Sequence, residues 1–252
     1  GVCTLNDHYS CGGRTVVADR TIRCHKTTGH GSQTFTETVM NSCNPAFIEW
    51  GRRVGVSSFY KYMGKLGLLS KTGIDIAGEA STIIHKQEKV GEVELATMSF
   101  GQSFQITPMQ MIRAAAAIVN GGNLVTPHFA VKTVDNNNET VNEFTYSIQS
   151  DAIDKHTSDV MRDILGQVVE KGGGSKAYIE GFSIGGKTAT SQKLPRGSGR
   201  YIASFIGFSS VDDPQIMAMC LIDEPVGAYY GGTIAAPVIR ELFENVLPYT
   251  LK

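Results

Sequence analysis

The chain has 252 residues, of which 41% are hydrophobic and 19% charged, and its formal net charge is −1. This composition is that of a globular protein, and the near-zero charge with scattered Lys and Arg argues against a nucleic-acid-binding surface. No apolar run approaches the roughly 18 residues that cross a bilayer, and no signal peptide opens the chain. The length fits one large domain or two small ones, and we expect a single domain over residues 1–252.

The first 33 residues are rich in Gly, Thr, Cys and His with weak periodicity, which predicts loops with short strands. The chain starts at GVCTLNDHYSCGG without an initiator Met, so we expect a piece of a longer protein, with any membrane anchor outside it. From Thr34 on, the spacing of apolar residues predicts helical segments interrupted at Asn44-Pro45.

The cysteine content is odd and low. The five cysteines are Cys3, Cys11, Cys24, Cys43 and Cys220. An odd number excludes complete pairing within the chain, and five cysteines are too sparse for a disulfide scaffold.

Residues of metal-binding types gather between residues 7 and 30. They are Asp7, His8, Cys11, Cys24, His25 and His30. Two thiols with imidazoles and a carboxylate can form a tetrahedral zinc site. We expect Asp7, Cys11, Cys24 and His30 to be the ligands of a structural zinc, although the spacing matches no standard zinc finger. A Cys11–Cys24 disulfide and unpaired structural cysteines are the alternatives.

The stretch NSCNPAF places Ser42 and Asn44 two residues apart in a loop before or between helices. A hydroxyl and a carboxamide at this spacing can face one cavity. With a lysine nearby they can serve proton transfer and hydrogen bonding in acyl chemistry. The alternative is that Asn44 is a helix N-cap followed by Pro45 at the first helical position.

The clearest helix is predicted from Pro108 to Asn120. Thr107 is a suitable N-cap, Gln110 completes a capping box, and the following glycines end the helix. Its run of alanines permits close packing, so we expect this helix to be central and buried. A second helix is predicted from about Asp151 to Lys171.

The C-terminal third predicts a sheet. The segments YIASFIGFSS and PQIMAMCLID are rich in strand formers and flank VDDP, a turn signal, which predicts a β-hairpin. The tail APVIRELFENVLPY predicts an amphipathic helix. Together these elements predict an α+β fold in which helices cover an antiparallel sheet.

Residues 181–188, GFSIGGKT, match the Walker A pattern, and IMAMCLIDE resembles a Walker B strand ending at Asp223. A phosphate loop, however, needs a buried strand before it and a helix after it. The preceding segment GSKAYIE is polar, and Pro195, Gly197 and Gly199 break any helix that would follow. We therefore reject the ATPase interpretation. A glycine bend that leads into an edge strand remains as the plain alternative.

Four blocks carry a family resemblance: HGSQTFTETVMNSCNPAF, GQSFQITPMQMIRAAAAIVNGG, GGKTATSQK and YIASFIGFSSVDDPQIMAMCLIDEP. Their order and spacing resemble class B penicillin-binding proteins over nearly the whole chain, above all the sporulation and division-specific D,D-transpeptidases of Gram-positive bacteria. The family uses Ser-x-x-Lys, Ser-x-Asn and Lys-Thr-Gly motifs. The resemblance implies the transpeptidase fold shared with β-lactamases.

The resemblance also implies roles for individual residues. Ser42 and Asn44 look like the Ser-x-Asn motif, and Lys187 and Thr188 look like the start of Lys-Thr-Gly on the strand that lines the groove. Lys187 would bring positive charge beside Ser42 and toward the substrate's terminal carboxylate, which the hydroxyls of Thr188 and Thr190 would bind. Thr190 stands where the family uses a backbone N–H as an oxyanion donor, worth roughly 3–4 kcal/mol of barrier.

The sequence departs from the family pattern in two ways. Ala189 replaces the glycine of Lys-Thr-Gly, which would narrow the groove. The Ser-x-x-Lys motif is missing upstream of the Ser-x-Asn motif, because neither Ser10 nor Ser32 has a lysine three residues on. We expect the literal match from Ser58 to Lys61 to be chance. The chain should therefore lack the nucleophile with its helix and the first strands of the sheet, and should be inactive alone.

The parent protein implied by this resemblance is a peptidoglycan transpeptidase. It would cross-link stem peptides ending in D-Ala-D-Ala through a serine acyl-enzyme, and β-lactams would acylate the same serine. It would act without a catalytic cofactor or nucleic acid at the extracytoplasmic face of the membrane, completed by the missing N-terminal part of its own domain. A non-catalytic β-lactam sensor or scaffold is the alternative, and the upstream sequence would distinguish the two. GHG around His30 belongs to the resemblance too, so His30 could instead anchor a loop.

Overall fold

The computed structural model describes residues 1–195 and 197–250. The helices are α1 (Phe35–Met40), α2 (Asn44–Lys65), α3 (Glu92–Ser99), α4 (Pro108–Val119), α5 (Lys155–Glu170), α6 (Gly231–Ile234) and α7 (Ala236–Thr250), with 3-10 turns η1 (Gln87–Lys89) and η2 (Ser175–Ala177). The strands are β1 (His8–Cys11), β2 (Arg14–Val17), β3 (Arg20–Arg23), β4 (Gly31–Thr34), β5 (Leu124–Val125), β6 (Lys132–Val134), β7 (Thr140–Glu143), β8 (Ile148–Gln149), β9 (Ile184–Gln192), β10 (Tyr201–Ser209) and β11 (Ile216–Asp223).

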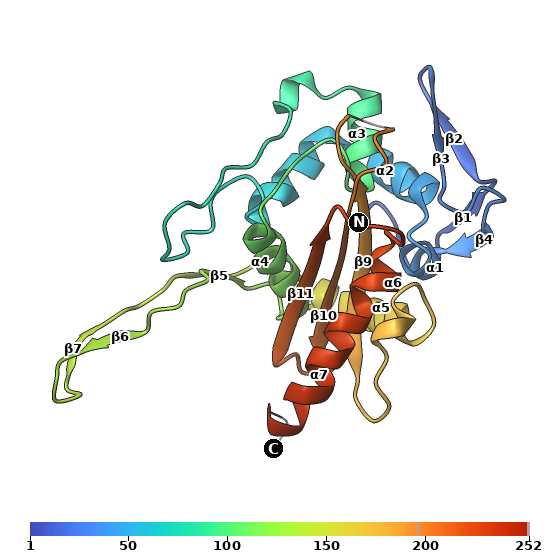
Figure 1. The fold of residues 1–252 in the computed structure, drawn as a ribbon. Helices are drawn as coiled ribbons and strands as arrows, with labels where there is room; N and C mark the ends of the chain where they lie inside the picture. The colour runs from blue at the N-terminus through green and yellow to red at the C-terminus, as the bar shows by residue number, and fades with distance from the viewer. Residues whose placement is uncertain (196, 251–252) are drawn as a thin grey trace.

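A three-stranded antiparallel sheet in the order β11-β10-β9 forms the centre of the fold. β10 and β11 are the predicted hairpin, and β9 pairs with the other side of β10. Helix α7 crosses one face of this sheet, and α5 lies behind the other face (Figure 1). The prediction of an α+β fold with an antiparallel sheet covered by helices is thus confirmed.

The two glycines before Lys187 lie inside strand β9, where they make room for aromatic rings. A Cβ on Gly185 would lie 2.2 Å from Cζ of Phe208, and a Cβ on Gly186 would lie 2.5 Å from Cζ of Phe205. Both phenylalanines are fully buried. Because β9 runs straight through GGKT and is followed by a strand, the rejection of a phosphate loop is confirmed.

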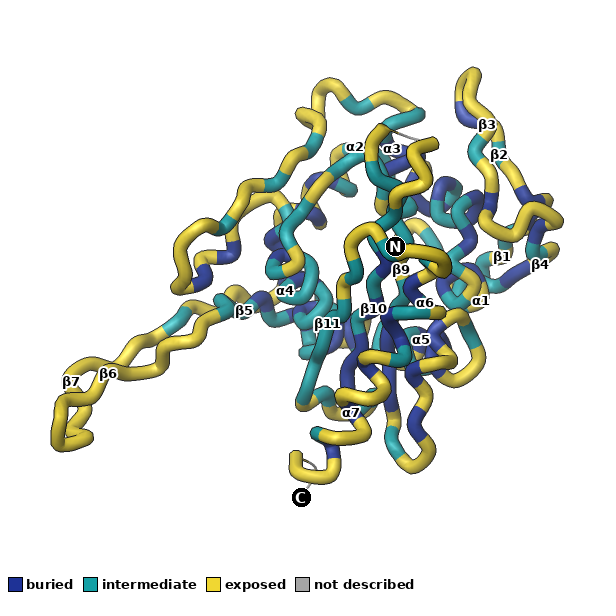
Figure 2. The backbone as a smooth tube through the Cα atoms, viewed as in Figure 1, coloured by how far each residue is buried: buried dark blue, intermediate teal, exposed yellow. Residues whose placement is uncertain are grey.

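The main hydrophobic core lies between the sheet and helix α7. Phe205 of β10 packs there with Ile239 and Phe243 of α7, and each is at most 2% exposed. A second cluster joins α1 to α5 through Val39 and Ile164. Helix α5 also packs against β9, so helices cover both faces of the sheet. The buried residues of the sheet lie on β9 and β10, whereas β11 is mostly half-buried (Figure 2).

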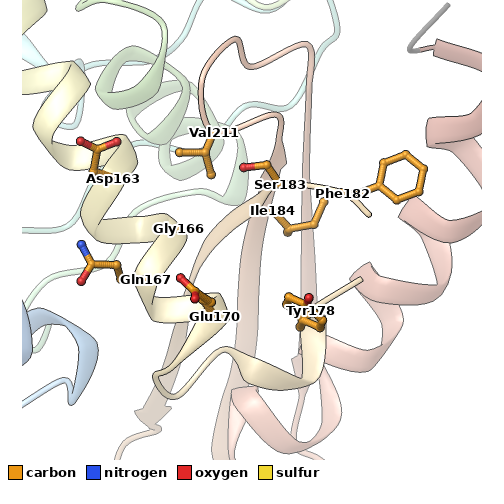
Figure 3. Close-up of a pocket in the computed structure, with 9 residues that line it drawn as sticks. All are labelled: Asp163, Gly166, Gln167, Glu170, Tyr178, Phe182, Ser183, Ile184 and Val211. Carbon is orange, nitrogen blue, oxygen red and sulfur yellow. The ribbon is translucent and has the colours of Figure 1, made fainter. Parts of the chain in front are cut away.

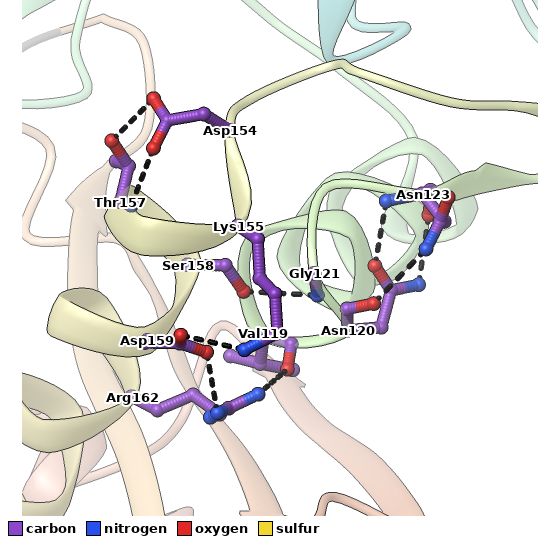
Figure 4. Close-up of polar contacts among 10 residues, drawn as sticks. All are labelled: Val119, Asn120, Gly121, Asn123, Asp154, Lys155, Thr157, Ser158, Asp159 and Arg162. Atoms are coloured by element: carbon purple, nitrogen blue, oxygen red, sulfur yellow. Dashed lines mark hydrogen bonds and ion pairs between the residues drawn. The ribbon is translucent and has the colours of Figure 1, made fainter.

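Helix α5 begins later than predicted, at Lys155, because Asp154 is its N-cap and accepts a hydrogen bond from the Thr157 amide. Its first turns are tied to the end of α4 by two contacts. Ser158 Oγ accepts from the Gly121 amide, and Arg162 donates to the Val119 carbonyl (Figure 4).

Helix α4 has the predicted capping box, in which the Gln110 amide donates to Thr107 Oγ1 and the Gln110 side chain accepts from the Thr107 amide. The expected burial holds in part. Gln110, Ala114, Ala117 and Val119 are buried, the other residues after Pro108 are half-buried, and the helix packs against α5 and β11.

The N-terminal third consists of short paired strands around α1 and α2, as expected for residues 1–33. The alternative role considered for Asn44, that of a helix N-cap, does not hold. Cys43 is the N-cap of α2, and Asn44 and Pro45 occupy the first turn. Helix α2 breaks direction at Gly55, which has a φ of +73°. Within residues 1–195 and 197–250, no helix combines the length and the apolar character that a bilayer crossing requires.

Candidate active site

Ser42 takes an unusual backbone conformation that the end of helix α1 imposes. Its amide donates to the Val39 carbonyl, and the Cys43 amide donates to the Thr38 carbonyl. These two bonds form a Schellman motif, in which the C′ residue normally is a glycine in the left-handed region. Here Ser42 occupies that place with a φ of +47°, a conformation that costs a non-glycine residue about 1–2 kcal/mol. Strain of this kind is typical of functional positions.

The strained serine meets Lys187. The Lys187 ammonium donates to Ser42 Oγ and, at 3.2 Å, to the carbonyl oxygen of Thr188. The structure therefore brings together two of the predicted catalytic residues from positions 145 residues apart. Burial lowers the pKa of Lys187 from 10.5 to about 8. A lysine near this pKa can both hold charge and exchange a proton at neutral pH.

Asn44 follows at the start of α2 and is half-buried. Its side-chain amide nitrogen lies 3.4 Å from the Arg23 carbonyl oxygen, a long hydrogen bond that orients the carboxamide beside Ser42. Trp50 fixes α2 against α1, because its indole N–H donates to Thr38 Oγ1 at 3.1 Å. Thr38 is fully buried.

Strand β9 is one of the two edge strands of this sheet, and its outer side pairs with no other described strand. The Lys193 amide donates to the Arg200 carbonyl at 2.9 Å, so these residues form a hydrogen-bonded pair with β10. Antiparallel pairs alternate along a ladder. The amide of Thr190 therefore points away from β10, toward the open edge. An oxyanion donor needs this orientation.

The side chain of Thr190 contacts helix α6, since its Oγ1 accepts from the Gly231 amide at 3.1 Å. Gly231 must be a glycine there, because a Cβ would lie 2.2 Å from the Ser204 carbonyl oxygen. Thr188 and Ala189 lie between Lys187 and Thr190 on the same strand, half-buried and exposed respectively. The predicted substrate-binding residues thus form one continuous edge.

The chance match to Ser-x-x-Lys lies away from this edge. Ser58 and Lys61 are both exposed on helix α2. A different cavity of about 490 Å³ opens between α5 and the start of β9, lined by Asp163, Glu170 and Ser183 among others (Figure 3). It contains no lysine, and it lies at the end of β9 opposite Thr190.

A cluster of three thiols and one imidazole adjoins the Ser42 loop. The ligand atoms of Cys11, Cys24, His30 and Cys43 all lie within 4.8 Å of one another. Three of these residues match the predicted metal ligands. The fourth is Cys43, which stands between Ser42 and Asn44.

Asp7 is not part of the cluster, which corrects the predicted ligand set. Its carboxylate accepts from the Thr4 amide at 2.7 Å and lies 3.6 Å from the Arg53 guanidinium. The sequence prediction overlooked Cys43 because it considered only residues close together in the chain. The signal that could have found it was the placement of a cysteine inside the Ser-x-Asn stretch.

The thiols are surrounded by N–H donors. The Gly13 amide donates to Cys11 Sγ at 3.4 Å, and His30 Nδ1 lies 3.5 Å from Cys24 Sγ. Burial opposes ionisation of Cys11, but the Gly13 and His30 amides outweigh it and lower its pKa. Burial raises the pKa of Cys43 to about 12. All five cysteines are free in this structure, so it contains no Cys11–Cys24 disulfide.

The cluster also lies close to Lys187. Burial, followed by the positive charge of Lys187, lowers the pKa of His25, the residue after Cys24. The His25 ring packs on His30 with centroids 5.2 Å apart. The cluster, the Ser42 loop and β9 therefore form one local unit.

Replacing Ser42 by Gly is expected to give a more stable protein than replacing it by Ala, by about 1 kcal/mol. Both variants lose the hydroxyl, and only glycine relieves the left-handed backbone at φ +47°. The difference corresponds to roughly 2–4 °C in thermal midpoint. The matched pair at exposed Ser58, in helix α2, should show the opposite order because glycine disfavours a helix. Equal midpoints for the two Ser42 variants would contradict this assignment.

The pKa of Lys187 predicts a pH dependence. In the full-length protein, non-covalent affinity for an anionic β-lactam should fall about tenfold between pH 7 and pH 9, as the ammonium loses its proton around pH 8. Lys187→Arg should bind less tightly but with a flat profile, since a guanidinium stays charged. If the affinity fell equally with pH in both proteins, the titrating group would be one other than Lys187.

The same shift has a consequence for stability. Between pH 8 and pH 10.5 the unfolded chain binds more protons at this lysine than the folded chain does. Burial of Lys187 therefore lowers the free energy of unfolding to its full extent below pH 8, and this loss of stability decreases as the pH rises to 10.5.

Comparison with known proteins agrees with this geometry. The sequence profile of the penicillin binding protein transpeptidase domain matches residues 1–244. Stage V sporulation protein D of Bacillus subtilis is 40% identical over 247 residues, which cover 96% of this chain and 38% of that protein. A probable peptidoglycan D,D-transpeptidase PenA of Neisseria gonorrhoeae is 27% identical and covers 83% of this chain and 35% of that protein. The chain thus spans well under half the length of these relatives.

Solved structures share the fold. The ligand-free structure of penicillin binding protein 3 from Mycobacterium tuberculosis superposes with a TM-score of 0.88 at 23% identity, over 98% of this chain and 58% of that one. The same protein has been solved in complex with ampicillin. A putative peptidoglycan glycosyltransferase from Atopobium parvulum gives a TM-score of 0.84 at 25% identity, over 97% of this chain and 58% of that one.

Proposed function

Since the chain belongs to the penicillin-binding protein transpeptidase domain family, we propose that it forms part of a peptidoglycan D,D-transpeptidase. The whole protein would cross-link stem peptides ending in D-Ala-D-Ala through a serine acyl-enzyme, and β-lactams would acylate the same serine. The observation that carries this proposal is the contact between Lys187 and Ser42 at the open edge of β9.

In this proposal each residue has a chemical task. Ser42 and Lys187 relay a proton between the nucleophile and an amine, which is the leaving amine in the first step and the attacking amine in the second. Lys187 also attracts the substrate's terminal carboxylate. Asn44 binds a peptide amide with its carboxamide. Thr188 offers a hydroxyl to the carboxylate, and the outward N–H of Thr190 stabilises the oxyanion. Thr190 Oγ1 keeps a proton to donate, because it already accepts from Gly231.

The nucleophile comes from sequence outside residues 1–252 in this proposal, because no serine upstream of Ser42 has a lysine three residues on. The outer edge of β11 supports this interpretation. This strand has eight residues, and the side chains that it packs on the core include Ile216, Ala218 and Ile222. Its outer edge pairs with no other described strand. Natural proteins seldom leave so long an apolar edge unpaired. Upstream strands of the same domain would cover it.

A fluorescent penicillin tests the assignment. The full-length protein should be labelled stoichiometrically, and peptide mapping should find the acyl group on a serine outside residues 1–252. Acylation of Ser42 or Ser58 would overturn the proposal. Release of D-Ala from a D-Ala-D-Ala peptide would establish a transpeptidase. Labelling without such turnover would establish a β-lactam sensor instead.

Because peptidoglycan lies outside the cytoplasmic membrane, we place the site on the extracytoplasmic side.

The Cys/His cluster is proposed to bind one structural zinc ion through Cys11, Cys24, Cys43 and His30. Three thiolates and an imidazole are a common ligand set for structural zinc. Ligand atoms within 4.8 Å need to contract by only about 1 Å, since tetrahedral sulfurs around zinc lie about 3.8 Å apart. Gln33 adds support, because its buried side-chain nitrogen has no hydrogen-bond partner among the described residues and would be free to donate to a metal-bound thiolate. Four protein ligands leave no position for a catalytic water.

A further inference from the structure

The β2–β3 hairpin carries a concentration of positive charge that the acyl chemistry does not use. Residues 12–30 contain four basic residues, Arg14, Arg20, Arg23 and Lys26, and one acidic residue, Asp19. The whole chain, by contrast, has a net charge of −1. Asp19 lies at the hairpin tip, 3.4 Å from Arg20. The charges at the base of the hairpin are therefore left without a counter-ion.

Two of these arginines face each other. Arg14 and Arg23 are directly opposite across the β2–β3 ladder. Like charges in this position destabilise a hairpin. Both residues are exposed, and among the described residues neither forms an ion pair. The inward-facing pair, Thr15 and Ile22, is half-buried, with Ile22 packed on the α2–α3 core. The arginine pair consequently lies on the solvent face of the hairpin.

The pair is adjacent to the candidate active site through the backbone. The Arg23 carbonyl accepts from the Asn44 side chain, and the Cys24 amide donates to the Gly13 carbonyl, which closes the base of the hairpin. The hairpin stands beside α2, with its exposed strands visible in Figures 1 and 2. One hydrogen bond thus links Arg23 to Asn44, and Arg14 lies opposite Arg23 in the same hairpin.

We infer that Arg14 and Arg23 bind a side-chain carboxylate of the peptide substrate, and so select acidic stem peptides over amidated ones. This inference rests on the proposed function. Two guanidinium groups can hold one carboxylate with paired hydrogen bonds, and they relieve their own repulsion by doing so. A carboxamide at the same place carries no charge and leaves that repulsion in place.

The test uses the full-length protein and two soluble pentapeptides ending in D-Ala-D-Ala. One carries a free side-chain carboxylate, and the other carries the corresponding carboxamide. The readout is the ratio of kcat/KM for the two peptides, measured as D-Ala release. This ratio should fall at least about fivefold in Arg14→Gln/Arg23→Gln, and it should also fall as salt rises. Because the ratio compares two peptides on the same protein, a lower fraction of folded protein in the variant cancels from it.

Arg20→Gln is the matched control, since Arg20 belongs to the same hairpin but pairs with Asp19 at its tip. Its ratio should stay within about twofold of the parent. An unchanged ratio in the double variant would overturn the inference, while turnover of both peptides would leave the proposed transpeptidase standing. Inhibition by poly(glycerol phosphate) that disappears in the double variant, with no change in the ratio, would assign the patch to a phosphate polymer instead.

Discussion

Lys187→Ala in the full-length protein is expected to lower the rate of acylation by a penicillin at least about 100-fold. The substitution removes the ammonium that donates to Ser42 and to the Thr188 carbonyl. It leaves Ser42 without a proton partner and leaves a buried space where a charged group has been. Stopped-flow measurement of acyl-enzyme formation, with the pre-covalent affinity determined separately, would show a loss in the acylation step as well as in binding.

Lys193 provides the control on the same chain segment. Its ammonium is bound by Asp223 and Glu224 at 2.9 and 2.7 Å on the protein surface. Exposed ion pairs contribute little, so Lys193→Ala should change acylation less than about twofold. Equal losses in the two variants would mean that the strand tolerates neither change and that Lys187 has no special role.

Periodicity and turn signals predicted much of the fold because they act locally. Thr107 and Gln110 form their capping box within one turn, and VDDP joins β10 to β11, which pair along their length. The exclusion of a phosphate loop also depended on local signals, namely the helix-breaking residues after Lys187. These parts of the structure required no knowledge of tertiary contacts.

The position of α4 and the start of α5 could not be predicted in the same way. The alanines of α4 signal close packing but not the partner, and in this structure only four residues of the helix are buried. The boundary of α5 depends on Asp154 capping Thr157, while Asp151 three residues earlier takes a φ of +63°. The packing of α4 and the start of α5 both depend on contacts that the spacing of apolar residues does not reveal.

In the candidate site, the motif residues followed from the resemblance, but their geometry did not. Nothing in NSCNPAF signals that Ser42 is the left-handed residue of a Schellman motif, because that position usually is glycine. The cluster of thiols and imidazole shows the same limit. Asp7 is near Cys11 in sequence, yet β1 carries it to Arg53, while α1 brings Cys43 back from 19 residues beyond Cys24.

The largest expected effect on stability concerns this cluster. Purified full-length protein should contain one zinc ion per chain by elemental analysis, and Cys43→Ser should lose it. Binding to the native state stabilises it by mass action. If removal of zinc by a chelator costs about 3 kcal/mol, the thermal midpoint should fall by roughly 6–12 °C. The Cys43→Ser protein should start from the lower midpoint and show no further response to the chelator.

Asp7→Ala separates the two ligand sets. Because the Asp7 carboxylate binds the Thr4 amide and lies outside the cluster, this variant should keep its zinc. Loss of zinc on Asp7→Ala with retention on Cys43→Ser would restore the set predicted from sequence. Absence of stoichiometric zinc, together with a mass two hydrogens below that of the reduced chain, would replace the metal by a disulfide. Cys43 lies between Ser42 and Asn44, so the order of the Ser42 loop should depend on the cluster. Removing the zinc should therefore also slow penicillin acylation.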